Sequence, residues 1–239
     1  MNFQKKNKKN YICIIPARGG SKGIKNKNTK ILGGKPLIYW TIKEAKKVQN
    51  FLKVIVSTDS EKIKSLSIKY KADCPFLRPK NIAKDNSPTI KAIKNVCGYL
   101  KKQNFDDFEY IVILQPTSPF RNKNDIERSL KIFERNKNAS SLISVVKVTD
   151  NHPARMYYKD KNKLIKNPLS EKKTGDPRQN LKEMYLRNGS IYIIKKNNLS
   201  KNFLGNNPIA FEMPKSRSLN IDDEFDLKIA RSLIKKNNL

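Results

Sequence analysis

The chain has 239 residues, and its 51 Lys and Arg against 21 Asp and Glu give a formal net charge of +30 and a pI of about 10.0. This length accommodates one large α/β domain, and no stretch approaches the roughly 20 apolar residues that a membrane-spanning helix needs. The three cysteines, Cys13, Cys74 and Cys97, show no C-x-x-C spacing. We therefore expect reduced thiols in a cytoplasmic protein that has no membrane partner.

The positive charge is spread along the chain rather than gathered in one segment. Lysines are mixed with asparagines throughout, as at 235–238, and are not interleaved with the stacking aromatic residues of nucleic-acid-binding segments. Only residues 1–10 have the composition of a basic tail, ahead of a single domain at 11–239. A non-catalytic nucleic-acid-binding protein is the alternative from another class, and it predicts tight, steeply salt-dependent binding to any duplex.

Strands and helices are predicted to alternate over the first 148 residues. Runs rich in β-branched residues predict buried strands at residues 11–15, 51–57, 110–114 and 142–148. Apolar residues at helical spacing predict helices at residues 36–48, 59–70, 88–100 and 124–133. This alternation is typical of a parallel sheet covered on both faces, in which ligands bind beyond the carboxyl ends of the strands.

The alternation breaks at residues 149–188, a polar stretch that contains His152, the only histidine of the chain. We interpret this stretch as an inserted flap or a subunit-contact arm. A further strand is predicted at residues 190–194, and an acidic segment then leads into a closing helix that runs through Leu233.

The loop after the first strand combines glycines with cations. These residues are Gly19, Gly20, Gly23, Arg18, Lys22 and Lys27. Glycines let main-chain N–H groups turn toward an anion, so the loop predicts a polyphosphate site. It matches neither the Walker A pattern nor the dinucleotide fingerprint, and a basic surface turn is the alternative interpretation.

Two further segments carry candidate functional side chains. Gln115 to Pro119 form a polar loop stiffened by prolines, which either holds an amide toward a sugar or base or is simply a strand exit. In the acidic segment, Glu224 and Asp226 suit the first turn of a helix. Asp222 precedes that helix, in a position suited to Mg²⁺ bound between a carboxylate and a phosphate.

Several of these segments, in this order, resemble the acylneuraminate cytidylyltransferase family, which comprises the CMP-sialic acid synthetases and their relatives for other nonulosonic acids. The matching segments are residues 15–28, Leu77-Arg78-Pro79, residues 114–121, His152-Pro153, residues 177–179 and residues 187–192. The resemblance implies a Rossmann-like nucleotidyltransferase fold, with a small arm at residues 149–188 that exchanges between the subunits of a homodimer. It also implies Mg²⁺-dependent transfer of CMP from CTP to the anomeric hydroxyl of a nonulosonic acid. The eight-carbon sugar Kdo is the alternative acceptor.

The resemblance assigns roles to individual residues. Those implied to bind the nucleotide are Arg18, Gly19, Gly20, Ser21, Lys22, Asn28 and Arg78. Those implied to be catalytic are Arg18, Lys22, Lys27 and Asp222. Those implied to bind the sugar are Gln115, Arg155 and Arg178, the two arginines on the side of its carboxylate.

One residue departs from the family pattern. The family presents D-x-D before its last helix, and here the first position is Asn220. An amide oxygen can still ligate Mg²⁺ beside Asp222 but carries no charge. Either Asp222 binds the cation with this weaker help, or Asp223 compensates, or activity is reduced.

Overall fold

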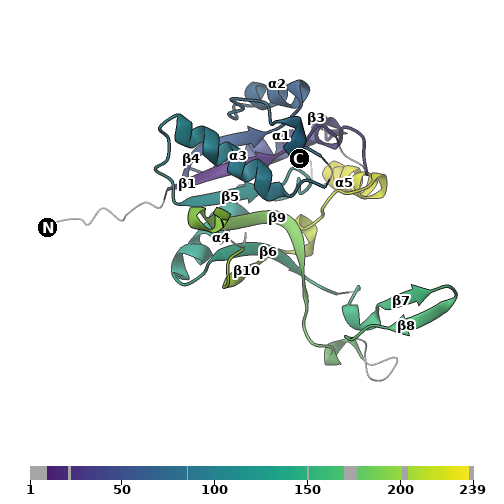
Figure 1. The fold of residues 1–239 in the computed structure, drawn as a ribbon. Coiled ribbons are helices and arrows are strands. Elements are labelled where there is room, and N and C mark those ends of the chain that lie inside the picture. The colour runs from purple at the N-terminus through teal and green to yellow at the C-terminus, as the bar shows by residue number, and fades with distance from the viewer. Residues whose placement is uncertain are drawn as a thin grey trace.

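The computed structural model describes residues 10–20, 23–84, 86–149, 151–169, 177–200 and 204–236. Six strands of these residues form one sheet in the order β10-β6-β9-β5-β1-β4 (Figure 1). They are β1 (Tyr11–Pro16), β4 (Phe51–Ser57), β5 (Tyr110–Leu114), β6 (Ser141–Lys147), β9 (Tyr185–Lys195) and β10 (Pro208–Glu212). The four strands predicted before residue 149 are therefore present.

The sheet is mostly parallel, which confirms the predicted fold class. β1 pairs in parallel with β4 and β5, and β10 pairs in parallel with β6, whereas β9 is antiparallel to both β5 and β6. The direction of β9 follows from the arm. The chain leaves the carboxyl end of β6 and returns from the arm directly into β9, and Val148 N–H donates to the Met184 carbonyl at 2.8 Å where the two legs separate.

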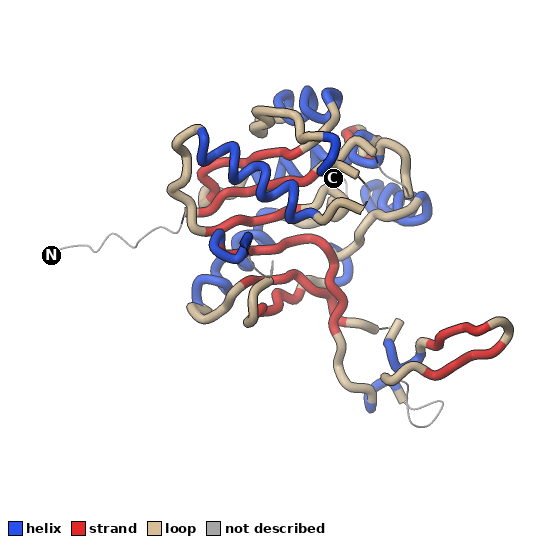
Figure 2. The backbone as a smooth tube through the Cα atoms, in the orientation of Figure 1, coloured by secondary structure: helices blue, strands red, loops and turns tan. Residues whose placement is uncertain are grey.

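Helices cover both faces of the sheet because alternate residues of each buried strand point to opposite sides. On one face, α1 (Leu37–Lys46), α2 (Glu61–Lys69) and α4 (Lys123–Arg135) share a core with Tyr11, Cys13 and Ile15. On the other face, α3 (Thr89–Lys102) packs on Ile12 and Ile14. Figure 2 shows α3 running diagonally in front of the strands of the body, with other helices behind them.

A third, smaller core lies beside the carboxyl ends of the strands. Here α5 (Glu224–Lys236) packs through Leu227 and Ala230 against Trp40 of α1. The same core buries Ile24, from the loop after β1, and Ile221, from the acidic segment. These two buried isoleucines hold the glycine-containing loop and the acidic segment next to each other.

The structure adds helix caps and short strands to the predicted elements. Ser60 caps α2, and Asn122 caps α4 in a capping box with Asp125, so α2 and α4 begin within one or two residues of their predicted starts. No strand was predicted at β10, an edge strand with one buried residue, or at the hairpin of β7 (Tyr157–Asp160) and β8 (Lys163–Lys166). All eight residues of that hairpin are exposed, so no alternation of buried and exposed positions marks them. A short β2 (Ile31–Leu32) and β3 (Lys35–Pro36) pair around Gly33 and Gly34.

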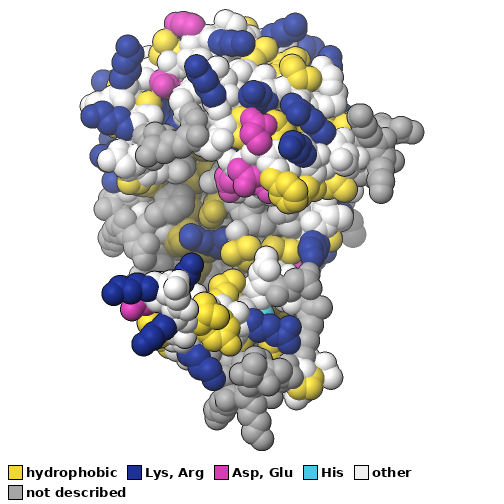
Figure 3. Space-filling model, turned by 90° about the vertical axis from the view of Figure 1, so that its right-hand side faces the viewer, with side chains coloured by type: hydrophobic (Ala, Val, Ile, Leu, Met, Phe, Trp, Pro, Cys, Tyr) yellow, Lys and Arg dark blue, Asp and Glu magenta, His cyan; other side chains and the backbone are white. Residues whose placement is uncertain are grey.

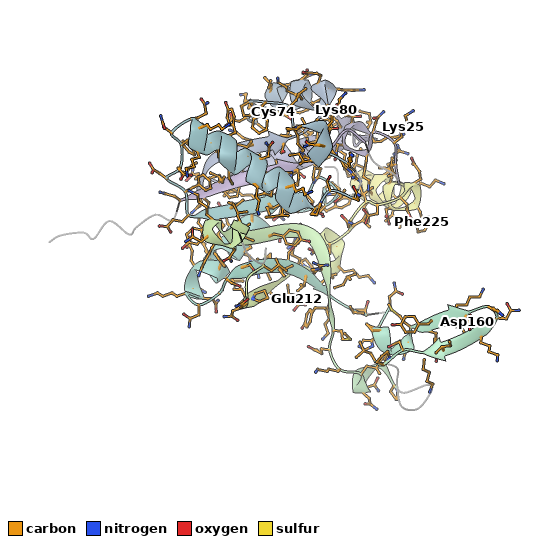
Figure 4. The ribbon with its side chains drawn as sticks, viewed as in Figure 1. Lys25, Cys74, Lys80, Asp160, Glu212 and Phe225 are labelled. Atoms are coloured by element: carbon orange, nitrogen blue, oxygen red, sulfur yellow. The ribbon has the colours of Figure 1, made fainter. Side chains whose placement is uncertain are left out.

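The β7–β8 hairpin projects away from the body on the arm (Figure 1). Asp160, at the turn of the hairpin, lies far from the sheet in Figure 4. Although the arm is polar overall, it exposes several large apolar side chains. They are Met156, Tyr157, Tyr158, Leu164, Ile165, Leu169, Tyr185 and Leu186.

The three cysteine thiols are buried and free, as expected for reduced core residues. Burial raises the pKa of Cys74 to about 11 and that of Cys97 to about 12. None of the described helices is both long enough and apolar enough to span a bilayer.

Candidate active site

A cleft of about 510 Å³ opens beyond the carboxyl ends of β1 and β5, where the sequence predicted a ligand site. It brings together six of the predicted site residues. They are Arg18, Lys27, Asn28, Arg78, Gln115 and Asp222. Lys84, Ser87 and Thr89, which lead into α3, line the opposite wall.

The glycine-containing loop is fixed to the strand beside it. Gly19 N–H donates to Asp59 Oδ1 at 2.8 Å, and Asn28 Nδ2 donates to the Arg18 carbonyl at 2.9 Å. Arg18 itself reaches across the cleft, and its Nη1 lies 3.3 Å from the Lys84 carbonyl. The N–H group of Gly19 therefore points at a carboxylate of the protein, which differs from the expectation that it faces a phosphate.

Asp59 is a site residue that the sequence analysis missed. It follows the buried strand β4, and the sequence analysis included it only as the first residue of the helix predicted at residues 59–70. Its position directly after a strand of a parallel sheet was a usable signal, because such positions lie at the ligand edge of the sheet.

Arg78 forms the wall of the cleft nearest β4. Its side chain is buried and donates from Nε to Ser57 Oγ at 3.1 Å and from Nη2 to the Ser57 carbonyl. Burial lowers the pKa of Arg78 from its ordinary value, while the nearby Asp59 carboxylate raises it and Arg18 lowers it. Two buried or half-buried guanidinium groups thus face the same space.

The acidic segment closes the cleft and lies directly against the glycine-containing loop. A Cβ atom on Gly23 would lie 2.2 Å from the Asp222 carbonyl oxygen, so only glycine allows this approach. The Lys27 ammonium donates to the carbonyls of Ile221 (2.8 Å) and Asp222 (3.2 Å), and lies 3.2 Å from Asp222 Oδ1. Lys27 therefore binds the acidic segment rather than pointing freely into the cleft.

The other acids of this segment cap α5. Asp226 accepts from the N–H groups of Asp222 and Asp223, and Asp223 Oδ1 accepts from Asp226 N–H. This capping role was expected for Asp226. Asp223 Oδ1 is thus engaged in the same cap, and the alternative that Asp223 compensates for Asn220 stays a prediction.

Asn220 lies beside Asp222 but presents its nitrogen to it. Its Nδ2 donates to Asp222 Oδ2. Its Oδ1 is buried, and no donor contacts it within the described part of the chain. The same part of the chain contains no group of three or more His, Cys, Asp or Glu side chains that could hold a metal ion.

Arg121 holds the main chain of Gln115, and the side chain of Gln115 lies against Gly189. The Gln115 carbonyl accepts from Arg121 Nη1 at 3.3 Å, and Arg121 also donates to the Ser190 carbonyl at 2.8 Å and to Thr41 Oγ1 at 2.8 Å. Arg121 is 1% exposed, and burial lowers its pKa to about 10. Gly189 has a φ of +70°, and a Cβ there would lie 2.9 Å from Gln115 Oε1. Arg121 and Gly189 were not singled out as site residues from the sequence.

Four of the predicted site residues that the structure describes do not line the cleft, namely Gly19, Gly20, Arg155 and Asn220. Arg155 ends a short 3-10 helix in the arm, and it is not among the residues that line the cleft. Ser21, Lys22 and the side chain of Arg178 lie outside what the structure describes. His152, the lone histidine, joins the legs of the arm, since Nε2 donates to the Lys182 carbonyl and Nδ1 accepts from Ala154 N–H.

Comparisons with known proteins agree with the fold. Residues 12–235 match the family model described as cytidylyltransferase. The chain is 36% identical to an N-acylneuraminate cytidylyltransferase of Escherichia coli O18:K1:H7, a match that covers 95% of this chain but only 52% of that protein. It thus spans about half the length of this relative.

Two shorter relatives are matched along almost their whole length. A pseudaminic acid cytidylyltransferase of Campylobacter jejuni (strain 81-176) and a CMP-N,N'-diacetyllegionaminic acid synthase of Legionella pneumophila are each 31% identical, over 95% of this chain and 97% of theirs. Among solved structures, a CMP:2-keto-3-deoxy-manno-octonic acid synthetase complexed with CTP superposes with a TM-score of 0.72 over 95% of this chain and 99% of that one. Its 15% identity supports the fold alone. The family match and the two relatives of similar length show that this chain belongs to the cytidylyltransferase family.

Proposed function

We propose that this protein transfers CMP from CTP to the anomeric hydroxyl of a nonulosonic acid and releases pyrophosphate. The observation that carries the proposal is the convergence of the glycine-containing loop, the Gln115 loop and Asp222 on one cation-lined cleft. The named activities of the relatives of similar length, on pseudaminic and legionaminic acids, support this class of acceptor. We also propose a cytoplasmic location, which the three free, buried thiols and the use of CTP as a substrate support.

The reaction is a displacement at the α-phosphorus of CTP. The anomeric oxygen forms a bond to that phosphorus, the bond from it to the bridging oxygen of the β-phosphate breaks, and the hydroxyl proton is released. Negative charge accumulates on the departing pyrophosphate, so preorganised cations lower the barrier. In this proposal Arg18, Arg78 and Lys84 supply those cations, and Lys22 joins them from the loop.

The donor set beside the cleft fits Mg²⁺. Mg²⁺ in enzymes that act on nucleotides is held by one or two carboxylates together with phosphates and waters. Asp222 is the exposed carboxylate, and the orphaned Oδ1 of Asn220 is a second oxygen that turning the amide would present. When bound, the ion would act as a Lewis acid toward the α-phosphate.

We further propose that the sugar lies on the Gln115 side of the cleft and that the arm of a second copy completes the site. Arg155 and Arg178, implied to face the sugar carboxylate, both belong to the arm, and Arg155 is not among the described residues that line the cleft of its own chain. The arm also exposes apolar side chains such as Tyr158 and Leu164, which a partner subunit would cover. A homodimer with exchanged arms accounts for both observations.

The test is a substrate panel at constant CTP and Mg²⁺. The purified protein is incubated with neuraminic, legionaminic, pseudaminic or Kdo acid, and pyrophosphate release is followed. Release with one or more nonulosonic acids is expected, and the ratio of kcat/KM values identifies the acceptor. Pyrophosphate release with Kdo alone would show that Kdo, and not a nonulosonic acid, is the acceptor. Release with none of the four sugars would refute the proposed function.

A further inference from the structure

Asp222 is engaged on both of its carboxylate oxygens. Lys27 Nζ lies 3.2 Å from Oδ1, and Asn220 Nδ2 donates to Oδ2. Asp222 is the single acidic side chain among the described residues that line the cleft. A cation that enters the cleft therefore meets a carboxylate whose charge is already balanced.

Lys27 is anchored and is not a mobile surface partner. Its side chain is only 11% exposed, whereas that of Asp222 is 70% exposed. An ammonium group has three N–H donors, and here three acceptors surround it, the carbonyls of Ile221 and Asp222 together with Asp222 Oδ1. The positive charge is thus held beside the carboxylate at the place where a metal ion would approach it.

The amide of Asn220 also favours the arrangement in which no metal ion is bound to Asp222. With Nδ2 toward Asp222, the oxygen that could ligate a cation faces away and has no donor among the described residues. Turning the amide would exchange the two atoms, satisfy the buried oxygen and remove a donor from Asp222. Such a turn is favourable only when a cation replaces that donor.

We propose that Lys27 is the resident counter-cation of Asp222 in the nucleotide-free enzyme, so that a divalent cation binds only together with the triphosphate. Without nucleotide, a divalent ion at Asp222 would be repelled by the ammonium beside it. With CTP in the cleft, the phosphates supply ligands to the ion and negative charge to Lys27. The inference rests on the proposed nucleotide site, but not on which sugar is used.

Binding of Mn²⁺ to the full chain tests this order. It is measured by electron paramagnetic resonance of free Mn²⁺ and by calorimetry, with and without CTP and with no acceptor sugar, and the Mn²⁺ that CTP binds in a protein-free reference is subtracted. In the wild type, Mn²⁺ binding is expected to be at least about tenfold tighter with CTP, because the phosphates offset the repulsion between Lys27 and the ion. Lys27→Met is expected to bind Mn²⁺ without CTP at least about tenfold more tightly than the wild type. Asp222→Asn is expected to lose Mn²⁺ binding in both conditions.

Lys25→Met is the matched control, because it removes the same charge from the same loop. Lys25 is exposed, does not line the cleft and lies on the outer surface in Figure 4. Its Mn²⁺ affinity should equal that of the wild type. Lys27→Gln is a second variant for the case that Lys27→Met fails to fold, since it keeps an amide donor for the Ile221 carbonyl and removes only the charge.

Two outcomes would overturn the inference. One is wild-type protein that binds Mn²⁺ equally well with and without CTP. The other is a folded Lys27 variant, with unchanged unfolding temperature, whose nucleotide-free Mn²⁺ affinity does not rise above that of the Lys25 control. Because neither readout uses turnover, failure of the sugar panel and failure of this inference are separate results.

Discussion

Gly23 lies against the main chain of Asp222, and the substitution Gly23→Ala tests whether this contact positions the reacting groups. The added Cβ would lie 2.2 Å from the Asp222 carbonyl oxygen, whereas carbon–oxygen contacts in proteins need about 3.3 Å. The loop and the acidic segment must therefore separate by about 1 Å. Asp222 and Lys27 would move with them.

The expected effect on catalysis is larger than the effect on folding. A misplacement of about 1 Å near the chemistry can reduce the rate about 10²-fold, which corresponds to about 2.7 kcal/mol of transition-state stabilisation. Overpacking costs about 1–3 kcal/mol of unfolding free energy, or a decrease of a few degrees in Tm per kcal/mol for a chain of this size. The folded enzyme should thus persist with little activity.

The assay is kcat/KM by pyrophosphate release, with Tm measured on the same preparation. Gly98→Ala is the control, since a Cβ at Gly98 meets no atom within 4 Å and Gly98 lies in α3, outside the cleft lining. It should keep kcat/KM within about twofold of the wild type. If Gly23→Ala also stays within that range, the close approach of the two segments is not needed for catalysis.

Three further substitutions test other parts of the site. Gly189→Ala forces a strained φ and pushes the Gln115 amide, so KM for the sugar should rise about tenfold while KM for CTP stays constant; a rise in both would contradict the assignment. Arg121→Met leaves buried acceptors without a donor and should lower the free energy of unfolding by about 2–3 kcal/mol in urea titrations; an unchanged value would refute that role. Leu164→Asp should convert a dimer into monomers in sedimentation experiments, and an unchanged mass would exclude the arm as the subunit contact.

Local signals in the sequence were enough for the strands and helices of the body. Apolar runs and caps act within a few residues, so β1, β5 and the helix after Ser60 were predicted within a few residues of their bounds. The direction of β9 was not predictable in this way, because it depends on the path of the arm that precedes it. The β7–β8 hairpin was missed because its side chains have no buried face in the isolated chain.

The candidate site was predictable where it depends on strand ends, and less so where it depends on tertiary contacts. The convergence of the loops after β1 and β5 follows from a parallel sheet, and the cleft lies there. Arg121 was not identified because a fully buried arginine cannot be distinguished from a surface arginine by its spacing alone. The contacts of Asp59 and Lys27 were not predicted, because their partners, Gly19 and Asp222 respectively, are distant from them in sequence.

The electrostatics of the cleft lead to the same binding order as the Lys27 contact. Among the described lining residues, four side chains are cationic (Arg18, Lys27, Arg78 and Lys84) and one is a carboxylate, a surplus of three positive charges. Figure 3 shows acidic side chains grouped on the body above the arm, with Lys and Arg side chains above and to the right of them. Such a field repels a bare divalent ion and attracts its anionic complex with a triphosphate. Salt screens both effects, so raising the ionic strength should weaken CTP binding and strengthen Mn²⁺ binding to the nucleotide-free protein. A change of the same sign for both ligands would show that the electrostatic field of the cleft does not set the order in which the nucleotide and the divalent ion bind.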